Sequence, residues 1–131
     1  MSRYALVADL YVHGAPASAF GSLTDAQRQQ ALDDASDDFD AVISSQGTLP
    51  LTAWPGTVTQ KLCHVATYQL LCVVGFNPNV GADMNYRLRH DDARSWMRDV
   101  ARGIIRPLVT FSTPRATTAQ PRVASKPLRR W

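Results

Sequence analysis

The sequence predicts a mainly α-helical protein: a small bundle of three to four helices with an extended C-terminal arm that has room for one short β segment. Three segments carry apolar residues at the spacing of amphipathic helices, and glycines and prolines separate them. The helical pattern stops at Gly103, after which prolines and basic residues prevail. With 131 residues, the chain has room for one core. We therefore expect a helical core domain at residues 1–103 and an arm at residues 104–131.

Two helices are predicted in the N-terminal part of the chain. Residues 6–12 form a short apolar stretch that a glycine and a proline end. Residues 24–45 form the clearest helix, because Thr24 and Gln27 match the capping-box pattern at its start. One face of this second helix is apolar and comprises Leu32, Ala35, Phe39 and Val42.

Two longer helices are predicted further along, after a loop at residues 46–55 that contains one glycine and two prolines. Three apolar side chains of this loop are expected to pack back onto the core: Leu49, Leu51 and Trp54. Residues 57–74 are apolar on nearly every side, which is typical of a central, buried helix. Residues 83–102 place apolar residues on one face and a narrow arginine stripe beside it. The predicted shared core contains Phe39, Leu62, Val65, Trp96 and Val100.

The last 28 residues differ in composition from the rest of the chain. Residues 104–131 contain four prolines, six basic residues and no acidic residue, and they hold too few apolar residues for a core of their own. Residues 108–111 are their one candidate for a short strand. We expect the arm from about residue 104 to residue 131 to be dispensable for folding, so that removal of residues 112–131 should leave the fold intact. Arginine and tryptophan are frequent anchors in binding pockets, so docking onto a partner is predicted for Arg122, Leu128, Arg129, Arg130 and Trp131.

Charge divides the chain into an acidic and a basic half. Residues 1–65 carry three basic side chains and seven aspartates, a net charge of −4, whereas residues 66–131 carry eleven basic side chains and four aspartates, a net charge of +7. Two oppositely charged faces suit head-to-tail contact between copies, although compositional drift explains the same numbers equally well. The predicted subunit interface comprises Asp33, Asp37, Asp40, Arg87, Arg94, Arg98 and Arg102.

No residue pattern predicts catalysis, and we expect a protein that is not an enzyme. Cys63 and His64 are adjacent, but neighbours on a helix point about 100° apart and cannot form a Cys–His pair with each other. His90 and Asp91 resemble a metal-phosphohydrolase dipeptide without its supporting histidines, and arginines one turn away are placed to pair with Asp91. A hydrolase that uses this dipeptide stays a third hypothesis.

Neither a cofactor, a metal nor a membrane is predicted as a partner. The cysteines and histidines lack the spacing of metal ligands, and no phosphate-binding glycine loop occurs. No apolar run approaches the roughly 20 residues that cross a bilayer, and the first residues do not resemble a secretory signal. Cys63 and Cys72 lie too far apart on one predicted helix to bond to each other. We expect both to be buried thiols in a protein made in a reducing cytoplasm.

A small basic DNA-binding protein is the main alternative function. The arginine stripe and the basic arm could neutralise phosphates. Aromatic residues are not interleaved with the basic ones as in single-strand binders, and no helix-turn-helix signature occurs. A protein that lines a DNA passage is also basic without reading sequence, so the two hypotheses overlap.

Four motifs occur in order along nearly the whole chain. The chain opens with Tyr4-Ala5-Leu6-Val7-Ala8-Asp9-Leu10, and a long helical pattern is followed by Leu49-Pro50-Leu51. The last helical pattern ends in Ala101-Arg102-Gly103, and the chain closes with Leu128-Arg129-Arg130-Trp131. In this order the motifs resemble the small Mu-like (gp36-type) structural family of tailed bacteriophages. One departure is Gly47-Thr48, where that family usually has an aromatic residue before the "LPL" motif.

The resemblance implies a head-to-tail connector (adaptor) protein of the virion neck with no catalysis. Such a subunit forms a closed ring, about twelve copies by the resemblance, through contacts between two different faces. The implied partners are other copies of the chain, the portal protein, a tail-side neck or tail terminator protein, and viral DNA that passes without sequence recognition. On this reading, the end of the arm docks onto the portal.

Overall fold

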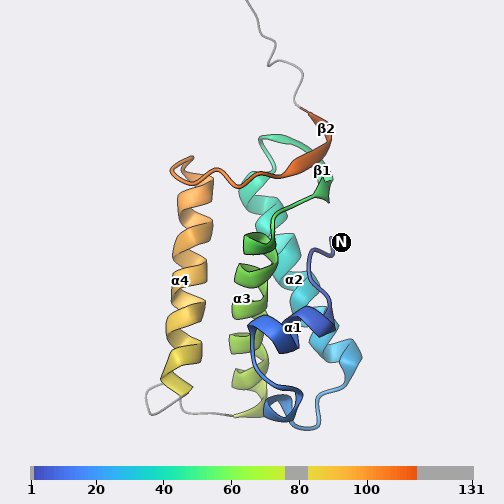
Figure 1. The fold of residues 1–131 in the computed structure, drawn as a ribbon, viewed down its shortest axis with the longest axis vertical. Coiled ribbons are helices and arrows are strands. Elements are labelled where there is room, and N and C mark those ends of the chain that lie inside the picture. The colour runs from blue at the N-terminus through green and yellow to red at the C-terminus, as the bar shows by residue number, and fades with distance from the viewer. Residues whose placement is uncertain (1, 76–82, 115–131) are drawn as a thin grey trace, which may run out of the picture.

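The computed structural model describes residues 2–75 and 83–114, in which three long helices stand side by side and a two-stranded sheet closes one end (Figure 1). A short N-terminal helix crosses the bundle on one face. The elements in chain order are α1 (Val7–His13), the 3-10 helix η1 (Ala17–Phe20), α2 (Asp25–Ile43), β1 (Gly47–Ala53), α3 (Gly56–Val74), α4 (Asp83–Ala101) and β2 (Thr110–Pro114). The predicted mainly α-helical class is confirmed.

The start of α2 lies where the capping box predicts it. The Gln27 amide donates to the Thr24 hydroxyl at 3.2 Å, and the Thr24 amide donates to the Gln27 side-chain oxygen at 2.8 Å. These two bonds satisfy amides that the first turn of a helix cannot pair internally. The apolar face of α2 points inward as predicted, since Leu32, Ala35 and Phe39 are buried and Val42 is partly buried against the core.

Part of the predicted loop at residues 46–55 is in fact a strand. Residues 47–53 form β1, whose register against β2 is irregular around Pro50, a residue with no amide hydrogen to donate to a neighbouring strand. Glycine and proline have low β-propensity, so the local sequence does not predict this strand. The predicted packing of the segment is confirmed, because Leu51 is buried and Leu49 and Trp54 pack against the core.

The partner strand, β2, begins at Thr110, two residues after the predicted start at residue 108. It runs antiparallel to β1, with Gly47 opposite Pro114 and Leu51 opposite Phe111. A Cβ atom at Gly47 would lie 2.4 Å from the Phe111 ring, so only glycine allows this close approach. The pairing joins segments about 60 residues apart in sequence, which no local pattern reveals.

The central position predicted for α3 is confirmed, because this helix contacts α1, α2 and α4. Its buried side chains include Leu62, Cys63 and Val65. Cys72 differs from the prediction and is exposed. It lies in the last turn of α3 beside Val73 and Val74, which are also exposed.

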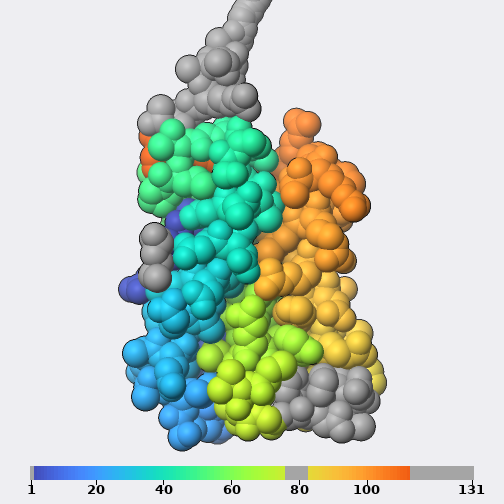
Figure 2. All heavy atoms as spheres, turned by 180° about the vertical axis from the view of Figure 1, so that it is seen from behind, coloured from blue at the N-terminus to red at the C-terminus, as the bar shows by residue number. Residues whose placement is uncertain are grey.

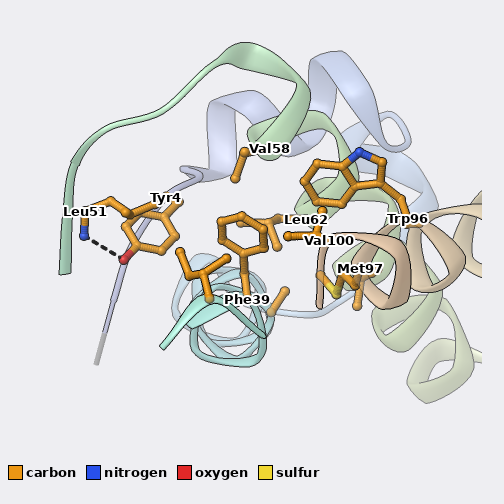
Figure 3. Packing of buried hydrophobic residues seen from close by; sticks show 12 residues of the cluster. Tyr4, Phe39, Leu51, Val58, Leu62, Trp96, Met97 and Val100 are labelled. Atoms are coloured by element: carbon orange, nitrogen blue, oxygen red, sulfur yellow. Dashed lines mark hydrogen bonds between the residues drawn. The ribbon is translucent and has the colours of Figure 1, made fainter. Parts of the chain in front are cut away.

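The predicted core is also confirmed, since Phe39, Leu62, Val65, Trp96 and Val100 are all buried in one cluster. Aromatic rings run through this cluster (Figure 3). Phe39 stacks on Trp96 with ring centroids 5.6 Å apart and meets the edge of Tyr4 at 6.4 Å. A second cluster fills the space between α1, η1, α2 and α3 around Leu10, Phe20 and Leu32.

The first part of the predicted arm belongs to the folded core. Ile105, Val109 and Phe111 are partly buried and pack against the main cluster. The predicted domain boundary at Gly103 is therefore too early, although that glycine does end α4, with a φ of 77° that favours glycine. The rest of the predicted arm, residues 115–131, lies outside the described residues.

Candidate interaction surface

The segment that precedes α1 is fixed to the aspartates of α2. The Arg3 guanidinium donates two hydrogen bonds to Asp33, from Nε to Oδ1 at 2.9 Å and from Nη2 to Oδ2 at 2.8 Å. The Ser2 amide donates to Oδ1 of Asp37 at 2.8 Å, and the Ser2 hydroxyl donates to Asp40. Charged acceptors make these bonds stronger than neutral ones.

Tyr4 extends this attachment to the sheet and to α3. Its side chain is buried, and its hydroxyl donates to Asp40 at 2.5 Å while accepting the Leu51 amide of β1 at 2.9 Å (Figure 3). Its carbonyl accepts the Thr59 hydroxyl of α3 at 2.9 Å. Burial, together with the hydrogen bond to Asp40, raises the pKa of the Tyr4 hydroxyl. One side chain therefore joins α2, β1 and the N-terminal segment.

These contacts correct the prediction of a subunit interface for Asp33, which is buried, whereas Asp37 and Asp40 are half-exposed and their role in an interface stays a prediction. Asp33 is only 2% exposed, and the other two are partly covered by Ser2 and Tyr4. Helical spacing places the aspartates on the polar side of α2. It does not reveal that a distant segment of the chain covers part of that side.

The ion pair of Asp33 predicts a pH-dependent loss of stability in the variant Asp33→Asn. The Arg3 guanidinium, with the Gln29 amide, holds the pKa of Asp33 below its usual 3.8, against the opposing effect of burial. A lowered pKa means that the carboxylate stabilises the fold above about pH 3.8 and that this contribution is lost as the pH falls through the lower value. We expect Asp33→Asn to lose about 1–3 kcal/mol at pH 7 and progressively less below pH 4, in thermal melts.

The matched control for this prediction is Asp34→Asn. Asp34 neighbours Asp33 but is exposed, and its side chain accepts the Gln30 side-chain amide at 2.8 Å. This control should melt close to the wild type at every pH. If Asp33→Asn loses as much stability at pH 2 as at pH 7, the loss does not come from the ion pair with Arg3.

Two of the four predicted interface arginines pair within the subunit. Nη1 of Arg94 lies 3.2 Å from Asp38 and so links α4 to α2. Nη1 of Arg87 lies 3.8 Å from Asp91, one turn along α4, as the sequence predicts. Both pairs are partly exposed, so each contributes at most about 1 kcal/mol and neither prevents a further contact.

Exposed charge of opposite sign remains on α2 and α4. Arg98 and Arg102 are exposed near the C-terminal end of α4, where Arg98 donates to the Ser95 hydroxyl at 2.9 Å. Asp34 and Asp38, which the sequence-based interface omits, are exposed one turn apart on α2. Asp33 and Asp37 have the same four-residue spacing, so no signal in the sequence distinguishes the two pairs. α2 and α4 form the two flanks of the face in Figure 2.

The candidate catalytic residues have ordinary structural partners. The His90 ring stacks on Tyr68 with centroids 4.3 Å apart, and its Nδ1 lies 3.3 Å from Asp91, which also pairs with Arg87. Burial raises the pKa of the Cys63 thiol to about 12, so the thiol stays protonated at neutral pH. Among the described residues, no group of three His, Cys, Asp or Glu side chains could hold a metal ion.

Two further predictions concern the membrane and the docking residues of the arm. Within residues 2–75 and 83–114, no helix combines the length and the hydrophobicity that crossing a bilayer requires. The residues predicted to dock onto a partner lie outside the described residues: Arg122, Leu128, Arg129, Arg130 and Trp131.

Comparison with known families agrees with the resemblance in the sequence. The model of the family described as Bacteriophage Mu, Gp36 matches residues 5–125. This range includes every helix and both strands of the described fold, from Val7 to Pro114. No curated protein matches the chain. The match covers far more than half of the sequence, and the chain therefore belongs to the Bacteriophage Mu Gp36 family of phage proteins.

Proposed function

We propose that this chain is a head-to-tail connector (adaptor) subunit of a phage, which forms a ring of copies between the portal protein and the tail-side proteins of the neck. The family supports a phage protein. The connector role rests on one observation, the opposite charges exposed on α2 and α4. In this role the subunit is part of the virion, acts without catalysis and lets DNA pass through the ring.

A closed ring needs two different, complementary faces on each subunit. Asp34 and Asp38 on α2 supply an acidic face, and a basic face is supplied by Arg98 on α4 together with Arg102, which directly follows α4. α2 and α4 lie beside each other on the face in Figure 2, where Arg94 of α4 pairs with Asp38 of α2 at 3.2 Å. We propose that the acidic face of one copy meets the basic face of the next. Complementary charges favour this register, and like charges disfavour back-to-back dimers.

The proposed absence of catalysis is consistent with the chemistry of the described residues. The Cys63 thiol is buried and protonated, which makes it a poor nucleophile. His90 and Asp91 are both engaged by neighbouring side chains on α3 and α4. The hydrolase hypothesis would need a substrate contact that displaces these partners.

Charge reversal at the two faces tests the proposal. We expect Asp34→Lys with Asp38→Lys, or Arg98→Glu with Arg102→Glu, to reduce ring formation about tenfold or more, because each brings like charges together. Combining all four changes should restore rings, since the charges are again complementary. Ring formation can be measured by electron microscopy and light scattering, with the protein alone or with its portal.

A matched control makes the same change in charge at other exposed positions of the same helices. Asp25→Lys with Asp92→Lys changes two exposed aspartates and should leave ring formation unchanged. Circular dichroism checks that every variant is folded. A wild-type protein that stays monomeric with its portal and binds DNA tightly would contradict the connector and favour the DNA-binding alternative.

A further inference from the structure

A groove with an apolar floor lies between the first half of α2 and the end of α3, which are side by side at the surface in Figure 2. Its volume is about 330 Å³, which is large enough to admit aliphatic side chains of a partner. Its apolar lining comprises Leu23, Ala31, Leu70 and Val73. Ala31 and Leu70 are buried, whereas Val73 is exposed. Asp34 lines the same groove, so an acidic group stands beside the apolar surface.

At the other end of the bundle, the segment between α4 and β2 exposes two large apolar side chains (Figure 1). Ile104 is 69% exposed and Leu108 is 88% exposed. Their neighbours in sequence hold the segment in place, because Ile105 and Val109 pack against the main core. The Ile104 amide also donates to the Asp99 carbonyl at 2.9 Å. The segment is therefore anchored before any partner binds, which lowers the entropy cost of a contact through its exposed side chains.

The charges beside these two apolar surfaces have opposite signs. Arg102 and Arg106 flank Ile104 in sequence and are exposed. Within residues 2–75 and 83–114, neither arginine forms an ion pair with a carboxylate. The groove instead carries the exposed carboxylate of Asp34. The exposed segment and the groove are therefore complementary both in apolar character and in charge.

We propose that Ile104 and Leu108 of one copy insert into the groove between α2 and α3 of a second copy, with Arg102 and Arg106 beside Asp34. The two surfaces lie at opposite ends of one bundle, so a copy cannot fill its own groove (Figure 1). The inference rests on the proposed ring and adds apolar anchors to its charged contact. Burial of the apolar side chains supplies affinity, and the charges around them set the register. Each copy contributes two different surfaces, as a ring requires.

Chemical cross-linking between copies tests the contact directly. All proteins carry Cys72→Ser, since Cys72 is an exposed thiol, whereas Cys63 is buried. One protein then carries Leu108→Cys, and a second carries Gln69→Cys at a residue that lines the groove. A short bismaleimide should link these two proteins to each other, because the contact places the two thiols side by side. Val12→Cys, at a similarly exposed position on α1, is the matched control and should not link to Gln69→Cys.

Serine substitutions measure the apolar anchors in the ring assay. We expect Ile104→Ser with Leu108→Ser to reduce ring formation about tenfold or more, because polar side chains no longer fill the groove. Val12→Ser should form rings like the wild type, and thermal melts check that both variants are folded. If the wild type forms rings but the cross-link is absent, another segment or partner fills the groove and the contact is wrong, while the ring stands. If the cross-link forms in closed dimers without rings, the contact stands and the ring is wrong.

Discussion

Truncation of Trp96 to alanine is expected to lower the free energy of unfolding by about 3–5 kcal/mol. The Trp96 ring is 9% exposed and stacks on Phe39 in the main core, with the planes 16° apart. The change removes this contact and leaves a cavity that Val100 and Met97 border in the same cluster. Since a domain of this size has about 5–15 kcal/mol in total, the loss should appear as a large fall in melting temperature and denaturation midpoint.

A control on the same helix separates packing from helix propensity. Leu88→Ala changes a side chain of α4 that is 46% exposed, and it should alter stability by at most about 0.5 kcal/mol. Trp96→Phe keeps an aromatic ring against Phe39 and should lie between the control and Trp96→Ala. A melting temperature of Trp96→Ala equal to that of the wild type would show that the inner face of α4 is misassigned.

Removal of residues 115–131 is expected to leave the fold intact and to abolish attachment to the portal. The removed segment carries five basic residues, no acidic residue and the tryptophan at position 131. The sequence alone suggested a cut after Phe111, but that cut would remove most of β2. A cut after Pro114 keeps β2 paired with β1 and so separates docking from folding.

Complementation of a phage that lacks the gene measures this effect. The truncated protein should melt within a few degrees of the full chain, while filled heads without tails accumulate. A full-length variant with Arg129→Gln, Arg130→Gln and Trp131→Ala tests the proposed anchors and should be similarly defective, because arginine and tryptophan dominate many binding interfaces. If the truncated protein gives normal yields of infectious particles, residues 115–131 do not have the proposed docking role.

The sequence by itself determined the four α-helices and the inner faces of α2 and α4. Capping at Thr24 and Gln27 and the spacing of Leu32, Ala35 and Phe39 act over one or two turns, so the information lies within the segment that folds. The same holds for the inner face of α4, where Trp96 and Val100 are buried as predicted. Local periodicity is sufficient for these features because a helix pairs its backbone groups internally.

Only the tertiary structure decided which polar positions stay free and where the sheet forms. Asp33 and Asp34 are neighbours of the same type, yet Arg3 covers one and leaves the other exposed. β1 contains glycine and proline and forms because Thr110–Pro114 lies beside it. Both outcomes depend on contacts between segments tens of residues apart, and the energy of such contacts is set by the folded arrangement rather than by any local pattern.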